Sequence, residues 1–223
     1  MANPGLSFVK TTDSVIATNK VLKNTYLLLS ATLGFSALTA MLSIVLAVPS
    51  WVYLASVIAS MVLGIFVLPR TANSSAGIGV IFLITGLLGF GLGAILTLYL
   101  ALPHGAQTVG LAFGGTAAIF LGLSGYALTS RRDFSFIGGF IFAGMMVVML
   151  AIIANLFLQM PALSLAIASV IILLMSGFIL FDTSRIARGE ETNYILATYG
   201  LYLSIFNIFI SLLQILGIMG SDD

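Results

Sequence analysis

The chain has 223 residues, of which 60% are hydrophobic and only 7% are charged. Soluble domains carry roughly 25% charged residues, so this composition excludes an ordinary water-soluble fold. The net charge of +1 gives no basis for nucleic-acid binding, and the lack of cysteine excludes disulfides and thiolate chemistry. The composition therefore indicates an all-α integral membrane protein embedded in a lipid bilayer.

Charged residues separate four uncharged stretches, which are residues 24–69, 71–130, 134–181 and 192–221. A spanning helix needs about 20 apolar residues, so each of the first three stretches holds two helices and the last holds one. Pro49, Pro103 and Pro161 interrupt the first three stretches, and each predicts a short turn because proline breaks a helix. The predicted spans are 25–47, 51–69, 77–101, 107–130, 136–158, 162–183 and 194–219.

The eight Lys and Arg residues test this count independently, because cytoplasmic loops collect positive charge. With seven spans, all of them fall on one side: Lys10, Lys20, Lys23, Arg70, Arg131, Arg132, Arg185 and Arg188. The other side carries His104, Asp222 and Asp223. The pattern predicts a seven-transmembrane-helix bundle with residues 1–24 as a cytoplasmic tail and residues 220–223 on the opposite side. The first apolar run is a full span, so we expect no cleaved signal peptide.

Glycines gather in the third and fourth predicted spans. Four of them crowd the third span, namely Gly86, Gly89, Gly91 and Gly93, while Gly110 and Gly114 have GxxxG spacing in the fourth. Small residues let helix backbones approach closely in lipid. We therefore expect these glycines to lie in interfaces between helices.

Two kinds of intramembrane protease are weakly matched. The residues GLSG at 122–125 resemble the serine motif of rhomboid proteases, but the single histidine, His104, precedes Ser124 and is predicted at the opposite face. An aspartyl protease needs two carboxylates that share a proton, whereas Asp182 is the only acid within a predicted span. We therefore expect no enzymatic activity.

Three amides, Asn155, Asn207 and Gln214, lie within the predicted spans. Amides in hydrocarbon seek partners, and hydrogen bonds between membrane helices contribute about 0.6 kcal/mol each. Two interpretations stay open at this point: the amides fix the packing of the bundle, or they line a polar path through it.

Asp182 follows the apolar run of the sixth span directly and precedes Arg185 by three residues. Charged groups in membrane helices face the bundle interior, a water-filled cavity or a partner. The spacing puts Arg185 on the same helical face and predicts an interfacial ion pair, while a functional acid is the alternative. Gly189 is expected to end this helix.

Residues 179–195, ILFDTSRIARGEETNYI, together with LYLSIFNIFISLLQILG at 201–217, resemble the carboxyl-terminal signature of the Bax-inhibitor family. The segments NKVLKNTYLLLS and RRDFSF resemble in particular the bacterial YccA-like branch of that family. The likeness covers nearly the whole chain. It implies a seven-helix protein of the bacterial inner membrane, with residues 220–223 in the periplasm, that binds and restrains an FtsH-like membrane protease through its amino-terminal tail.

The resemblance also implies a second function, a calcium- or proton-sensitive cation pathway in which acids on helices six and seven pair. Asp182 matches the first acid, Ser204 occupies the position of the second, and Arg70 lies near a basic residue that pairs with these acids in some members. A serine cannot share a proton with Asp182 or supply a carboxylate to calcium. This chain therefore departs from the family pattern at Ser204.

Overall fold

The computed structural model describes residues 5–130 and 132–220, which form helices and turns without any strand. Seven apolar helical segments in this part of the chain are long enough to cross a membrane. The predicted all-α bundle of seven spans is thereby confirmed. The helices are α1 (Gly5–Val45), α2 (Trp51–Val62) with the π-helical turn η1 (Leu63–Val67) and α3 (Leu68–Thr71), α4 (Ser75–Leu100), α5 (Gly105–Ser130), the 3-10 turn η2 (Ser135–Ile137), α6 (Gly138–Leu158), α7 (Pro161–Ala187) and α8 (Tyr194–Met219).

The three predicted proline turns lie where the sequence places them. Pro49 lies between α1 and α2, and Pro103 lies between α4 and α5. Pro161 is the first residue of α7, a position where the missing backbone N–H has no helical partner to lose. His104 lies in the α4–α5 turn, exposed and with a positive φ of 57°.

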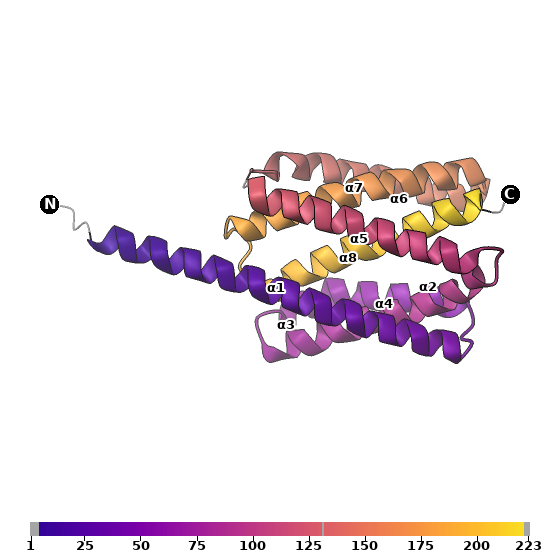
Figure 1. Cartoon of the computed structure of the whole chain (residues 1–223), viewed down its shortest axis with the longest axis horizontal. Helices are drawn as coiled ribbons and strands as arrows, with labels where there is room; N and C mark the ends of the chain where they lie inside the picture. The colour runs from indigo at the N-terminus through magenta and orange to yellow at the C-terminus, as the bar shows by residue number, and fades with distance from the viewer. Residues whose placement is uncertain (1–4, 131, 221–223) are drawn as a thin grey trace.

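The last helix, α8, runs through the middle of the bundle (Figure 1). It packs against α1 and α4 on one side and against α5 and α7 on the other. Leu201 and Tyr202 of α8 join the core cluster that includes Leu29 of α1, while Ile208 joins a second cluster with Ile179 of α7. Both cores therefore depend on α8.

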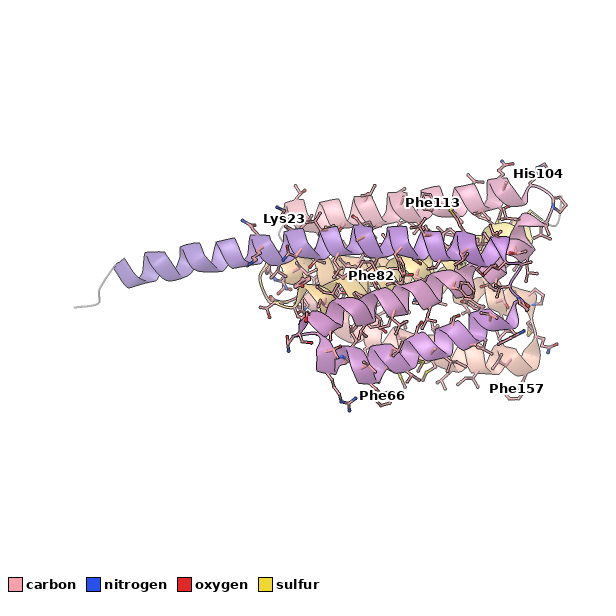
Figure 2. All side chains as sticks on the ribbon, turned by 90° about the horizontal axis from the view of Figure 1, so that it is seen from below. Lys23, Phe66, Phe82, His104, Phe113 and Phe157 are labelled. Atoms are coloured by element: carbon pink, nitrogen blue, oxygen red, sulfur yellow. The ribbon has the colours of Figure 1, made fainter. Side chains whose placement is uncertain are left out.

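The outer surface of the bundle is apolar. Large side chains such as Phe113, Phe140 and Phe157 are 70%, 74% and 84% exposed, and Figure 2 shows Phe113 and Phe157 on the outside of the helices. Such exposure is favourable only where lipid tails replace water around the side chains. The exposed aromatics therefore support a position within the bilayer.

Basic residues lie at one end of the bundle, called here the basic end and defined by Lys23, Arg70, Arg185 and Arg188. Lys23 and His104 lie at opposite ends in Figure 2. The amino-terminal part of α1 projects beyond the basic end, and α8 finishes at the other (Figure 1). An odd number of spans requires this arrangement of the two chain ends.

Glycines of α4 let α1 pack unusually close. A Cβ added at Gly86 would lie 2.6 Å from the ring of Phe35, and one at Gly89 or Gly93 would overlap a backbone carbonyl oxygen of α1. Gly91 faces α2 instead, where its Cβ would lie 2.8 Å from that of Ser56. The expected role of the α4 glycines in helix packing is confirmed.

The same expectation is wrong for α5. A Cβ added at Gly110 or Gly114 would meet nothing within 4 Å, and both residues are exposed. GxxxG spacing creates a face of small residues, but the neighbours of the helix decide whether that face is covered. In α5 it points outward from the bundle.

Replacement of Gly89 by Ala is expected to lower the thermal midpoint of the detergent-purified protein, because the new Cβ drives α1 and α4 apart at a cost of about 1–3 kcal/mol. Gly110→Ala is the matched control: it brings the same gain in helix propensity, about 1 kcal/mol, into open space. Equal thermal midpoints for the two variants would contradict the close packing of α1 on α4.

Candidate functional site

Asp182 lines a cavity of about 270 Å³ between the end of α7 and the start of α8, at the basic end. Arg185 and Glu191 are the other charged residues in its lining. The remaining lining residues are Phe178, Ile186, Leu196, Ala197, Tyr199 and Gly200. The cavity thus combines three charges with an otherwise mostly apolar wall.

The turn between α7 and α8 returns the chain to this cavity. Gly189 has a φ of 75°, a conformation that glycine adopts without strain, and it ends α7 as predicted. The Asn193 side chain then caps α8 by accepting hydrogen bonds from the backbone N–H groups of Ile195 and Leu196, at 2.9 and 3.2 Å. Glu191 lies between the Gly189 turn and the Asn193 cap, and it therefore faces the end of α7.

The carboxylate of Asp182 points toward α8. Its Oδ2 lies 2.5 Å from the position that a Cβ on residue 200 would take, so only glycine leaves room for the carboxylate there. The predicted ion pair with Arg185 is wrong: within the described residues no cation lies within 4 Å of Asp182. Arg185 instead lies 3.7 Å from Glu191 and stacks over the ring of Phe181, 5.3 Å from its centroid, because the turn brings Glu191 within its reach.

Ser204 and Arg70, the other two residues picked out by the family resemblance, do not meet Asp182. The Ser204 hydroxyl is buried and donates to the carbonyl oxygen of Gly200 in its own helix, at 3.0 Å. Arg70 is exposed, and its guanidinium donates to the carbonyl oxygen of Phe66. The contact of Asp182 with α8 is therefore made at Gly200, one turn before Ser204.

The three amides within the spans lie apart from one another. Asn155 donates to the Ser164 hydroxyl at 2.7 Å and accepts from the Met160 backbone, so it joins the end of α6 to the start of α7. Asn207 donates to the carbonyl oxygen of Leu203 within α8, and Gln214 is half-buried further along that helix. The hydrogen bonds of Asn155 join two helices, and this residue lies at the end of the bundle opposite the cavity.

The cavity does not fit a resident calcium ion. Calcium takes roughly six to eight oxygen ligands, whereas the lining supplies the carboxylates of Asp182 and Glu191 beside the cation of Arg185. Across residues 5–130 and 132–220, no cluster of three or more His, Cys, Asp or Glu side chains is placed to hold a metal. We expect no cofactor from the sequence, and the calcium that the family resemblance allows gains no support from these ligands.

Arg188 fastens the turn before α8 to the loop before α6. Its guanidinium lies 2.6 Å from Asp133 and 2.8 Å from Glu190, and it donates to the Ser135 hydroxyl at 2.9 Å. The backbone N–H of Ser135 lowers the pKa of Asp133, and the hydrogen bond from Arg188 lowers the pKa of Glu190. Both carboxylates thus stay ionised, and Glu190 in turn raises the pKa of Arg188.

Asn193 ties the same turn to the other half of the bundle. Its side-chain amide donates to the carbonyl oxygen of Ala72 at 3.0 Å and to the Asn73 side chain at 2.8 Å. Glu191 is therefore held in place from both sides. Glu191 was not predicted as a site residue from the sequence, because a residue in a loop was not expected to face Asp182. The feature that could have identified it is Gly189, whose turn brings the chain back beside Asp182.

Stability is expected to fall when the pH is lowered through the pKa values of Asp133 and Glu190. These values are depressed in the folded protein, so the ion pairs contribute fully above the ordinary carboxylate range of about pH 4 and are lost below it. Thermal midpoints measured from pH 7 down to about pH 3 should show this loss. In Arg188→Gln the thermal midpoint should fall less steeply as the pH drops below about 4. A pH profile identical to that of the wild type would refute a contribution of the ion pairs of Arg188 with Asp133 and Glu190.

Comparison with known proteins bears on the whole chain. The family model described as "Inhibitor of apoptosis-promoting Bax1" matches residues 18–221. An "Uncharacterized membrane protein" of Vibrio cholerae is 48% identical over the full length of both chains. The "Modulator of FtsH protease YccA" of Escherichia coli is 50% identical over 94% of each chain, and the corresponding protein of another E. coli strain is named "Inner membrane protein YccA".

These similarities agree with the family resemblance of residues 179–195. They also agree with the prediction of a multi-pass protein of the bacterial inner membrane. They extend from the first residues of the spanning part of α1 to the end of α8. The chain belongs to the Bax-inhibitor family.

Proposed function

We propose that this chain modulates an FtsH-like ATP-dependent membrane protease and does so without catalysing a reaction. The observation that carries the proposal is the 50% identity, over 94% of both chains, to the E. coli protein named as a modulator of FtsH protease. Similarity of that extent takes in nearly all of the chain, and the family model matches residues 18–221. The proposal therefore concerns the whole chain and not a single segment.

Two structural features support a regulatory role. The amino-terminal part of α1 projects from the basic end, which is the predicted cytoplasmic end (Figure 1). Residues 5–17, which precede the span that begins at Thr18, are called here the projecting segment, and they offer a protease a segment to contact. The bundle behind it is closely packed, and α1 lies directly against Gly86, Gly89 and Gly93 of α4. A protease that binds the projecting segment would then hold a chain that is difficult to extract, which limits its action on other membrane proteins.

The full-length protein is expected to co-purify with the protease from native membranes and to slow its degradation of a reporter membrane protein. A variant that starts at Thr18 lacks the projecting segment and should lose both effects, while Gly110→Ala, altered on the outer face of α5, should keep them. Mass spectrometry of the purified complex and reporter half-lives measure the two effects. Full-length protein that binds no protease and leaves the half-life unchanged would refute the proposal.

A second candidate function, passage of protons or cations near Asp182, is supported by one observation. The Asp182 carboxylate faces a cavity and makes no hydrogen bond or ion pair within residues 5–130 and 132–220. An acid in this situation is free to bind a proton or a passing cation. Glu191 supplies a second carboxylate in the same lining, although Ser204 does not.

Flux through reconstituted liposomes is the measurement that separates this candidate from the regulator. If ions pass near Asp182, Asp182→Asn should reduce the flux and weaken its pH dependence, because the asparagine cannot ionise and Glu191 is the one carboxylate left in the lining. Asp133→Asn is the matched control, since Asp133 is exposed at the same end but lies outside the cavity. Wild-type flux equal to that of empty liposomes at every pH would rule the candidate out.

A further inference from the structure

The first helix carries polar contacts to other helices inside the apolar bundle. The Tyr202 hydroxyl of α8 donates to the carbonyl oxygen of Thr85 in α4, at 3.3 Å, and accepts from the Ser36 hydroxyl of α1, at 2.7 Å. Ser36 is 6% exposed and Tyr202 1% exposed. One tyrosine hydroxyl thus joins three helices where water is excluded.

A second group of contacts lies nearer the basic end. The Thr198 hydroxyl of α8 shares its proton between two carbonyl oxygens, that of Tyr194 in its own helix at 2.7 Å and that of Thr25 in α1 at 3.2 Å. Thr198 and Thr25 are both fully buried. The Tyr26 hydroxyl bonds the Ser124 hydroxyl of α5, which in turn lies 3.2 Å from that of Thr183 in α7. This accounts for Ser124, the serine of the GLSG segment, as a packing residue.

These contacts reach a second helix, whereas many hydroxyls in membrane helices bond only their own helix. Ser30, also on α1, is exposed and donates to the carbonyl oxygen of Tyr26 in its own helix, at 2.8 Å. Thr129 of α5 is likewise exposed and bonds its own helix at Gly125. Neither hydroxyl holds one helix against another.

The two groups of contacts lie on one rigid helix, at residues 25–26 and at residue 36. Ten residues of α-helix separate them by about 15 Å. Because α1 is continuous from Gly5 to Val45, a pull on its amino end loads both groups along the helix axis together. A hydroxyl that loses its partner in the bilayer core finds no water to replace it.

We infer that the contacts of Tyr26, Tyr202 and Thr198 fasten α1 so that it resists extraction from its amino end. In the setting of the proposed function, on which this inference rests, they are what stalls a protease that pulls on the projecting segment. The close packing on the α4 glycines keeps α1 in reach of its partners. Polar side chains then act together with close packing to hold the protein against degradation.

The test compares the full-length protein with the triple variant Tyr26→Phe, Tyr202→Phe and Thr198→Val, which removes the hydroxyls and keeps the side-chain shapes. The matched control is Ser30→Ala, Tyr126→Phe and Thr129→Val, in which three hydroxyls are removed from exposed positions. Each protein is reconstituted in lipid nanodiscs and pulled by its amino end in single-molecule force spectroscopy. Helix content and elution volume establish that each variant is folded.

At a fixed force, α1 of the triple variant should leave the bundle roughly twentyfold faster than in the wild type, because each hydrogen bond between membrane helices changes an equilibrium roughly threefold. The control should behave as the wild type does. Equal extraction rates in all three proteins would overturn the inference. Should the triple variant not fold, Tyr202→Phe alone should still give a measurable acceleration, and its absence would overturn the inference equally.

A second arm uses the purified FtsH-like protease in proteoliposomes. The triple variant should be degraded faster than wild type and control, and its tail should still bind the protease. Faster extraction by force without faster degradation would overturn the link to proteolysis. The force measurement contains no protease, so it tests the contacts of α1 alone. If the wild-type protein does not bind the protease, the proposed function fails, whatever the extraction rates are.

Discussion

The close approach of α1 to α4 is the constraint on which much of the bundle depends. Gly89 and Gly93 leave no space for a side chain between the two backbones, so the inner face of α1 lies near the centre of the bundle. Only at that depth can Ser36 reach the hydroxyl of Tyr202. In hydrocarbon the burial of apolar side chains gives little drive to association, because lipid tails are equally apolar. Close packing and buried hydroxyl contacts therefore carry most of the specificity.

Much of the fold could be predicted because the bilayer sets a fixed length for each span and the charges mark its ends. Pro49, Pro103 and Pro161 gave the turns, and Gly189 gave the end of α7. The neighbours of each helix could not be predicted in the same way. The glycines of α4 are covered by α1 and α2, whereas Gly110 is exposed on α5. The spacing of glycines along one helix does not tell which of them another helix covers.

The site shows a similar limit. From the sequence we predicted that Asp182 lies at the inner end of a span and that Ser204 replaces the second acid. We also predicted an ion pair between Asp182 and Arg185, from their spacing along the helix alone. The structure gives Arg185 to Glu191, through a turn fixed by Gly189, Arg188 and Asn193. A pair formed across a turn depends on how the turn folds, which local spacing does not specify. The carboxylate of Asp182 is left facing Gly200, the one residue type that leaves it room.

The central position of α8 has a consequence for biosynthesis. This helix emerges from the ribosome after the other six spans, yet it contributes Leu201, Tyr202 and Ile208 to the two cores. Until it inserts, α7 lacks its main partner, α1 has its packing on α4 but none on α8, and the buried hydroxyl of Ser36 has no tyrosine to bond. The first six spans can therefore pair, as α1 does with α4, but they cannot complete either core before α8 inserts, and a chain that stops short of Tyr194 has an unfilled centre.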